Sequence, residues 1–139
     1  MRAYWGTRVL MKILNEQPPI LDKLLKAGLK PQKTTVFAYG DTLYNPSGVE
    51  IPPDILVHEE VHIRQQKDNK NACLEKYLND KEYRLKVEVE AFREQYKFVC
   101  EMLKDRNYRA KCLHSLAQEL SGSVYGKIIN YSEAINKIK

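Results

Sequence analysis

The stretch that decides the fold covers residues 53–66 and reads PDILVHEEVHIRQQ. Proline at its start and Asp54 in its first turn predict that an α-helix begins here. Because an α-helix turns once in about 3.6 residues, His58 and His62 lie one above the other on the same face. Two imidazoles at this spacing suit a metal ion, and Glu59 projects toward the same opening. The stretch therefore predicts a metal-binding helix.

Length and composition are those of a small globular protein. The chain has 139 residues, 43% hydrophobic and 29% charged, which is enough to bury a core without additional cross-links. No apolar run reaches the roughly 18 residues that span a bilayer. The apolar patch from Val9 to Leu14 is short and interrupted by Lys12, unlike a secretion signal. We therefore expect one domain over residues 1–139, located in the cytoplasm and without a membrane partner.

The cysteines and the net charge indicate the expected cellular compartment and the expected kind of partner. Cys73, Cys100 and Cys112 cannot all pair within the chain and lack the close spacing of metal-binding cysteines, so we expect thiols in a reducing compartment. The formal net charge is +5, but basic residues are interleaved with acidic ones instead of forming a block. This pattern favours a solvated surface over a nucleic-acid interface. A basic nucleic-acid-binding module is therefore the least favoured function.

Two helical segments are expected near the N-terminus. Residues 1–17 carry apolar side chains at helical spacing, although Val9 to Leu14 also suits a short strand, and we favour a helix. Two prolines then interrupt the chain. The apolar stripe within residues 20–25 predicts a second, short helix that ends at Gly28.

β-branched and aromatic residues next predict a small antiparallel sheet. The expected strands are Thr34–Tyr39 and Thr42–Tyr44, joined by a turn that begins at Gly40. Residues 49–51 are a candidate third strand after a further turn. The sheet precedes the metal-binding helix in the chain.

Helices account for the rest of the sequence. A short helix is expected around residues 72–78, and Asn79-Asp80 has the character of a cap for the longest helix, over residues 81–105. A further helix is expected over residues 107–120, and Ser132 is the expected cap of a last short helix. The predicted fold class is therefore α+β, mostly helical, with a small antiparallel sheet before the metal-binding helix.

The two histidines need a third protein ligand, because catalytic zinc sites normally take three and leave the fourth position to water. The remaining histidine, His114, lies outside the close spacing of a three-histidine motif, so a carboxylate is expected instead. The longest helix offers Glu88 and Glu90. How side chains share the faces of that helix decides whether one of them, or neither, meets the histidines.

With these residues the chain resembles the gluzincins, the thermolysin-like zinc peptidases with two histidine ligands on one helix and a glutamate on a later one. The similarity covers mainly residues 34–98 and is closest to minimal, single-domain members. Glu90-Ala91-x-x-Glu94 is similar to the glutamate helix of that family. The resemblance implies Zn²⁺ as cofactor and Glu90 as the third ligand, with Glu88 as the rival. It also implies that Glu94 accepts a hydrogen bond from one imidazole.

The same resemblance implies that a metal-activated water hydrolyses a peptide or protein substrate, with Glu59 as general base. The expected enzyme is a small endopeptidase. A donor for the oxyanion is expected from Tyr125, with Tyr39 and His114 as alternatives.

Zincins also hold an extended substrate along the edge strand of their sheet. By resemblance, residues 36–39 or 49–51 would offer backbone groups to a peptide. The alternative is a catalytically inactive zincin scaffold that binds or regulates a partner. Substitution of Glu59 by glutamine distinguishes the two functions, because only the enzyme needs the base.

Overall fold

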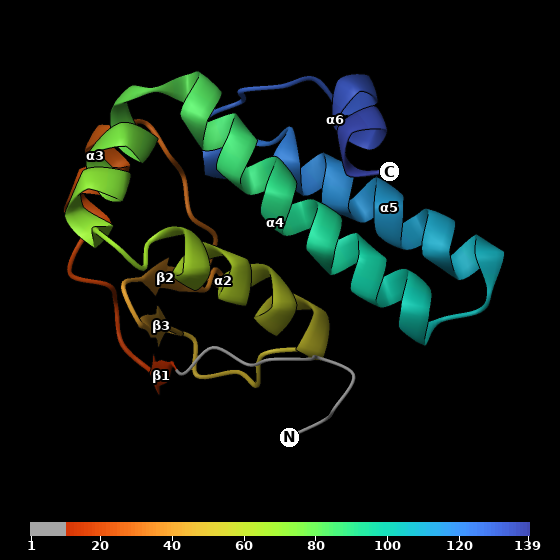
Figure 1. The fold of residues 1–139 in the computed structure, drawn as a ribbon, viewed down its shortest axis with the longest axis horizontal. Helices are drawn as coiled ribbons and strands as arrows, with labels where there is room; N and C mark the ends of the chain where they lie inside the picture. The colour runs from red at the N-terminus through yellow and green to blue at the C-terminus, as the bar shows by residue number, and fades with distance from the viewer. Residues whose placement is uncertain (1–10) are drawn as a thin grey trace.

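The computed structural model describes residues 11–139 and shows a mostly helical chain with one small sheet. Its two longest helices, α4 (Lys81–Met102) and α5 (Arg106–Leu120), lie side by side and run antiparallel (Figure 1). The short helix α6 (Tyr131–Ile138) packs on both of them, and α2 (Pro53–Gln65) packs on α4. The predicted α+β class and the helix predicted over residues 53–66 are therefore confirmed.

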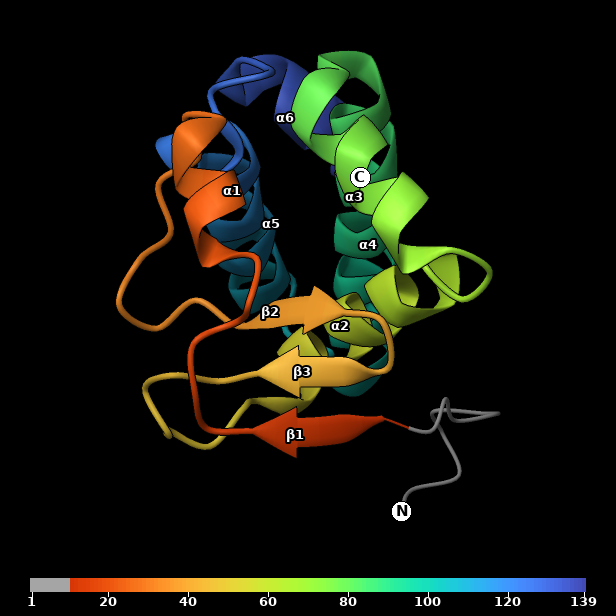
Figure 2. The same ribbon diagram turned by 90° about the vertical axis from the view of Figure 1, so that its left-hand side faces the viewer.

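The sheet is mixed, so the prediction of an antiparallel sheet is wrong in part. The expected hairpin of β2 (Phe37–Tyr39) and β3 (Thr42–Tyr44) is present, but β1 (Lys12–Leu14) pairs parallel to β3 on its other side (Figure 2). Gly40 opens the hairpin turn at a φ of 68°, which glycine adopts readily because it lacks a Cβ. Residues 49–51 form no strand, because β1 already occupies the edge of β3.

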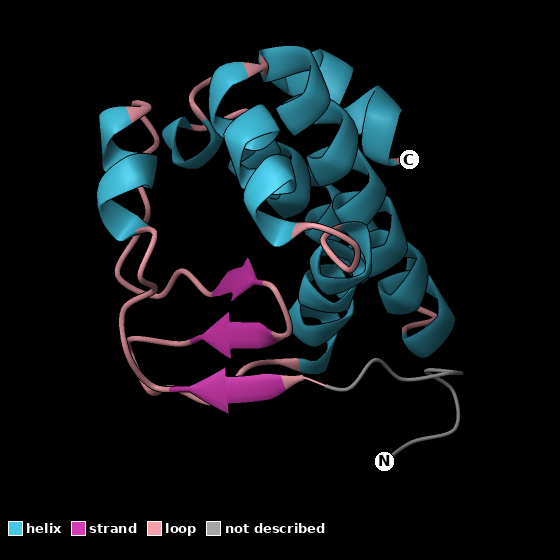
Figure 3. Cartoon of the chain, turned by 60° about the vertical axis from the view of Figure 1, so that its left-hand side comes forward, coloured by secondary structure: helices cyan, strands magenta, loops and turns pink. Residues whose placement is uncertain are grey.

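The helix predicted over residues 1–17 is wrong where the structure describes that segment. Lys12–Leu14 is a strand, anchored at its start by the amide of Lys12, which donates to the carbonyl of Asp41 at 2.9 Å. Sheet pairing here overrides the helical spacing of the apolar residues. The rest of the prediction, residues 1–10, lies outside the described residues. The three strands lie together at one edge of the helical body (Figure 3).

Capping side chains mark the start of several of the described helices. Asp80 accepts from the amide of Tyr83 at 3.1 Å, as predicted for the start of α4. Asp105 caps α5 in the same way, and therefore α4 ends at Met102 and does not extend to residue 105. Asn130, not Ser132, caps α6, because its side chain accepts from the amide of Glu133.

The remaining helices are short. The helix α1 (Leu21–Lys26) stops before Gly28, which has a φ of 88°, as the sequence predicts. The helix α3 (Lys70–Asn79) leads into α4, and a single 3₁₀ turn, η2 (Ser123–Tyr125), follows α5. None of the helices that the structure describes combines the length and apolar character needed to cross a bilayer.

Two hydrophobic clusters hold these elements together. One surrounds Phe92 where α4, α5 and α6 meet, and its other buried members are Leu113, Leu116, Ala117, Leu120, Ala134 and Ile138. The other joins α1 to α3 through Ile20, Leu24, Leu29 and Leu74. The first cluster fixes α4, and the second places α1 and α3 over the side of α4 that carries the candidate site.

Helix α4 buries two different faces. One face meets α5 and α6 through Phe92 and its neighbours, as the apolar spacing predicts. The other face turns toward α2 and α3, and its buried residues are Arg84, Val87, Glu88, Ala91 and Gln95. Because most of the second face is polar, hydrophobic periodicity does not reveal it. This face supplies the glutamate of the candidate site.

Candidate metal centre

Two histidines from α2 and one glutamate from α4 converge at a candidate metal centre. The Nε2 atoms of His58 and His62 lie 3.2 Å apart, one helical turn separating the residues. Glu88 Oε1 lies 3.1 Å from the Nε2 of His62 and 3.3 Å from that of His58. His58 and Glu88 are buried, and His62 is half-buried. The predicted histidine pair thus meets a carboxylate, as required.

The triangle formed by these three atoms has the size that a metal ion requires. A tetrahedral zinc ion with bonds of about 2.0–2.1 Å holds its ligand atoms about 3.3–3.4 Å apart, close to the observed 3.1–3.3 Å. Two imidazoles and one carboxylate form a common ligand set for zinc and for other divalent transition metals. His58, His62 and Glu88 are therefore able to hold a metal ion.

The predicted choice of Glu90 as third ligand is corrected by this geometry. Glu90 is exposed, and its carboxylate accepts from the side chain of Gln65 at 2.8 Å, away from the triangle. Glu88 takes the place of the candidate third ligand because it shares the face of α4 that packs on α2, together with Ala91 and Gln95. Residues two apart on a helix point about 200° apart around its axis, so Glu88 and Glu90 cannot both face α2.

His58 is held by an amide and not by the predicted carboxylate of Glu94. Its Nδ1 lies 2.9 Å from Gln95 Oε1, and Gln95 Nε2 donates to Asp54 Oδ2 at 2.8 Å. Glu94 is exposed and lines a separate hollow between α2 and α4. Gln95 stands two turns after Glu88 and therefore shares its face, whereas Glu94 is one position off that face.

His62 has a matching amide partner on its own helix. Its Nδ1 lies 2.8 Å from Gln65 Oε1, and Gln65 Nε2 donates both to Glu90 and to the carbonyl of Val87, at 2.8 and 3.1 Å. Gln65 thereby links α2 to α4 beside the triangle. Both histidines present Nε2 to Glu88 and Nδ1 to a glutamine.

Tyr77 on α3 holds the other oxygen of Glu88. Its hydroxyl donates to Glu88 Oε2 at 2.6 Å, so that Oε1 alone faces the histidines. Burial, together with the charge of Glu88, raises the pKa of Tyr77 well above its usual value and keeps the hydroxyl protonated. Tyr77 therefore fixes the carboxylate as a single-oxygen ligand.

The metal-free triangle carries an ion pair. Burial opposes protonation of His62, but the adjacent Glu88 carboxylate outweighs it and raises the pKa of His62 to about 9. Burial likewise opposes ionisation of Glu88, but the two imidazoles hold its pKa well below the usual range. A proton on His62 thus occupies the place that a cation would take.

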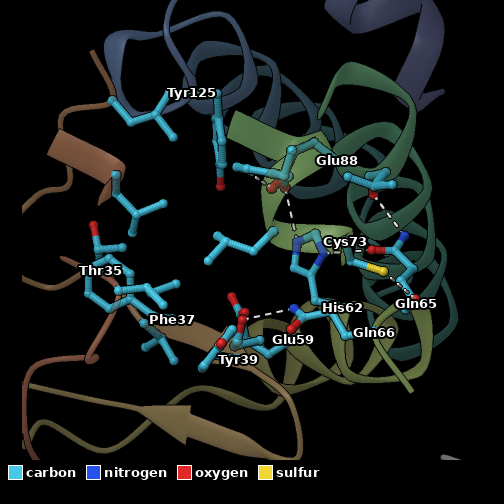
Figure 4. Close-up of a pocket in the computed structure, with 18 of the residues that line it drawn as sticks. Thr35, Phe37, Tyr39, Glu59, His62, Gln65, Gln66, Cys73, Glu88 and Tyr125 are labelled. Carbon is cyan, nitrogen blue, oxygen red and sulfur yellow. Dashed lines mark hydrogen bonds and ion pairs between the residues drawn. The ribbon is translucent and has the colours of Figure 1, made fainter. Parts of the chain in front are cut away.

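Glu59 faces a cavity that opens beside the triangle (Figure 4). Its carboxyl group is buried, and burial raises its pKa to about 6, an effect that the nearby imidazoles reduce. The cavity has a volume of about 120 Å³ and is also lined by His58, His62 and Glu88. The predicted general base and the three candidate ligands therefore share one space.

Tyr125 reaches the same cavity from η2, on the side opposite α2 (Figure 4). Its ring packs edge-on against Phe92, with centroids 5.8 Å apart. Burial and the nearby carboxylates raise the pKa of Tyr125 well above its usual value, so the hydroxyl remains a proton donor. The structure thus brings Tyr125 to the site, where the sequence predicted a donor.

The two alternative donors, Tyr39 and His114, each contact another side chain. Tyr39 also lines the cavity, but its hydroxyl already donates to Asn71. His114 is exposed on α5, where it contacts the hydroxyl of Tyr131, and it is not among the described residues that line the cavity. Of the three candidates, Tyr125 is the one whose hydroxyl is directed into the cavity and has no hydrogen bond with another described side chain.

The rest of the cavity wall is mostly apolar and comes from several elements. Its apolar residues on α1, β2, α3, α4 and the loops include Leu24, Leu29, Phe37, Leu74, Val87 and Val124. The edge strand β2 forms one wall. The side-chain amide of Gln66 occupies part of that edge, since it donates to Ala38 O at 2.9 Å and accepts from the amide of Gly40 at 2.8 Å.

Sequence reasoning connected neither Gln95 nor Tyr77 with the site. A signal for Gln95 was its position two turns after Glu88, within a face that also carries Val87 and Ala91. Tyr77 gave no such signal, because the packing of α3 on α4 brings it to Glu88.

Comparisons of the chain with protein-family models, curated proteins and solved structures found no match. Function is therefore inferred from the residues of the site.

Proposed function

We propose that this protein is a small zinc-dependent endopeptidase that uses Glu59 as its general base. The observation that carries the proposal is that Glu59 faces the same cavity as His58, His62 and Glu88. Such sites combine a metal held by three protein ligands with a carboxylate that is not a ligand. Zn²⁺ is the proposed metal, because the spacing of the donor atoms suits tetrahedral coordination.

When bound, zinc would lower the pKa of a water molecule and polarise the substrate carbonyl. Glu59 takes the proton of the attacking water and later delivers it to the leaving amine. Tyr125, opposite α2, donates a hydrogen bond to the oxyanion that develops on the substrate. The apolar wall excludes water from these groups and strengthens their interactions.

A peptide substrate is supported by the edge strand beside the site. An extended chain binds such an edge by backbone hydrogen bonds, and β2 lines the cavity. The amide of Gln66 already bonds to Ala38 O and to the amide of Gly40, so a peptide would pair with the part of this edge that precedes Ala38 O. We further propose a reducing, cytoplasmic compartment, with which the three free cysteines agree.

The decisive experiment combines metal analysis with the variant Glu59→Gln. The purified protein is expected to hold about one zinc per chain and to cleave members of an unbiased peptide library, with cleavage abolished by a chelator and restored by zinc. Glu59→Gln should keep the zinc but lose at least about 100-fold in kcat, because the amide retains the shape and not the base.

Glu94→Gln is the matched control, since it makes the same chemical change on an exposed side chain outside the cavity. It should leave cleavage unchanged. A zinc-loaded wild-type protein that cleaves nothing, or a Glu59→Gln variant that retains full function, would contradict the proposed enzyme and favour a binding or regulatory scaffold.

A further inference from the structure

Each histidine of the candidate centre is linked through one glutamine to one carboxylate. His58 Nδ1 faces Gln95 Oε1 at 2.9 Å, and Gln95 Nε2 faces Asp54 Oδ2 at 2.8 Å. His62 Nδ1 faces Gln65 Oε1 at 2.8 Å, and Gln65 Nε2 faces Glu90 at 2.8 Å. The two arrangements have the same atoms in the same order, although their residues come from different positions on α2 and α4.

The carboxylate at the end of each arrangement determines the direction of every hydrogen bond in it. An ionised carboxylate only accepts, so the amide nitrogen must face it. The amide oxygen must then face the imidazole, and since that oxygen only accepts, the proton must be on Nδ1. The other nitrogen, Nε2, is then the one that can offer its lone pair to a metal ion, once the proton that His62 shares with Glu88 has left. The orientation therefore follows from chemistry and does not depend on how an amide is drawn.

We propose that Asp54–Gln95 and Glu90–Gln65 are two positioning relays that hold His58 and His62 as metal-binding Nε2 tautomers. The inference rests on the proposed function in one respect: the triangle of His58, His62 and Glu88 must bind zinc. It gives Glu90 a role outside the ligand set, as one of the two acceptors, with the carbonyl of Val87, that fix the amide of Gln65. Asp54 has the same role for Gln95 and, as part of the first turn of α2, also ties the start of that helix to α4.

The relays also set the charge around the metal. An amide, and not a carboxylate, touches each imidazole, so neither histidine gains anionic character from a directly bonded acid. The carboxylates lie one side chain farther out, where Glu90 is exposed to solvent. The relays thus orient both ligands without adding a formal negative charge next to either ring.

The test removes each distal carboxylate in turn and observes both histidines. Glu90→Gln and Asp54→Asn keep the size of the side chain but remove the carboxylate that accepts from the neighbouring amide, so its orientation is held less firmly. In Glu90→Gln the carbonyl of Val87 remains as the second acceptor of Gln65 Nε2. The readout is ¹⁵N NMR of the zinc-loaded protein with its histidines labelled. The sequence has three histidines, so His114 serves as an internal reference. Glu90→Gln should speed solvent exchange of the Nδ1 proton of His62 several-fold and leave that of His58 unchanged. Asp54→Asn should do the reverse.

Zinc affinity provides a second readout that does not require activity. Competition with a chromogenic chelator should show about tenfold weaker zinc binding for Glu90→Gln, in the range found when partners of metal ligands are removed. Gln65→Met should weaken binding by about 10–100-fold. Gln66→Met is its matched control, because it removes the side-chain amide of the next residue, just after α2, which bonds to β2 and to neither histidine. Glu94→Gln controls for the change on α4. Both controls should bind zinc as the wild type does.

Three outcomes are distinguishable. Selective changes at the histidine of each relay support the proposal. The relays are overturned if zinc binding is normal and the exchange rates of the Nδ1 protons do not change selectively. Equal changes at both histidines in both variants overturn them as well. In either case the proposed enzyme is unaffected. A wild-type protein that binds no zinc overturns both the relays and the proposed function.

Discussion

At the scale of single residues, the centre of the site consists of three hydrogen-bond acceptor atoms that lie close together. Nε2 of His58, Nε2 of His62 and Oε1 of Glu88 lie 3.1–3.3 Å apart, and three lone pairs this close require a cation between them. In the metal-free protein that cation is the proton of His62, whose pKa the Glu88 carboxylate raises, against the effect of burial, to about 9. Metal and proton therefore compete for one position.

This competition predicts the pH dependence of zinc binding. Below pH 9 His62 is mostly protonated, and zinc must displace that proton, so apparent affinity should fall about tenfold for each unit of decreasing pH. At pH 7.5 about one proton should leave per zinc bound. Isothermal titration calorimetry in two buffers of different ionisation enthalpy measures this number. Binding that releases no proton at pH 7.5 would contradict the ion pair.

The identity of the third ligand gives a second prediction at this scale. Glu88→Gln should weaken zinc binding by more than about 100-fold, beyond the loss caused by removing an outer partner of a ligand. Glu90→Gln, two residues along the same helix, should cost only about tenfold. Chelator competition on the two variants ranks them. Equal losses, or a larger loss for Glu90→Gln, would restore Glu90 as the ligand.

At the scale of elements, the site depends on how α2 is fixed to its two neighbours. Helix α4 contacts it along one polar face, and β2 contacts its C-terminal end. Gln66, the residue that follows α2, makes the second connection, since its amide bonds to Ala38 O and to the amide of Gly40. This amide reproduces part of the hydrogen bonding that a further strand would make with β2.

Loss of this connection should destabilise the protein without emptying the site. Gln66→Met removes two hydrogen bonds and leaves two backbone groups half-buried, at an expected cost of about 1–3 kcal/mol in the free energy of unfolding. Urea denaturation of the metal-free protein measures the loss. Zinc affinity should stay at the wild-type value, because neither histidine contacts Gln66. Unchanged stability would show that water replaces the amide at no cost.

At the scale of the whole molecule, the candidate ligands join elements that are distant in sequence. His62 and Glu88 are 26 residues apart, and α3, which lies between them in the chain, returns Tyr77 to the same carboxylate. A cluster of buried polar groups from separate helices exists only in the folded chain. A metal bound there should therefore bind the native state in preference to the unfolded chain.

Zinc should accordingly raise thermal stability. At a free zinc concentration about 100 times the Kd, linkage predicts a gain of about 2.7 kcal/mol, or roughly 10 °C in Tm for a domain of this size. Differential scanning calorimetry with and without chelator measures the shift. Glu88→Gln should show no such shift at the same zinc concentration. A wild-type Tm that does not respond to zinc would contradict the centre.

The sequence by itself determined the elements whose signals are local. His58, Glu59 and His62 fall on one helix because their spacing matches the helical turn, and the hairpin around Gly40 and the cap at Asp80 rest on single residues with strong conformational preferences. These features need no information from the rest of the chain, and the structure has them where they were predicted.

Only the tertiary structure decided which side chains meet. Glu88 and Glu90 are alike in type and two residues apart, and the packing of α4 on both α2 and α5 selects Glu88. The same packing brings Gln95 to His58, while β1 joins the sheet from the N-terminal side. The physical reason is that the rotation of a helix about its own axis depends on both faces it buries, and the polar face of α4 has no hydrophobic pattern to mark it.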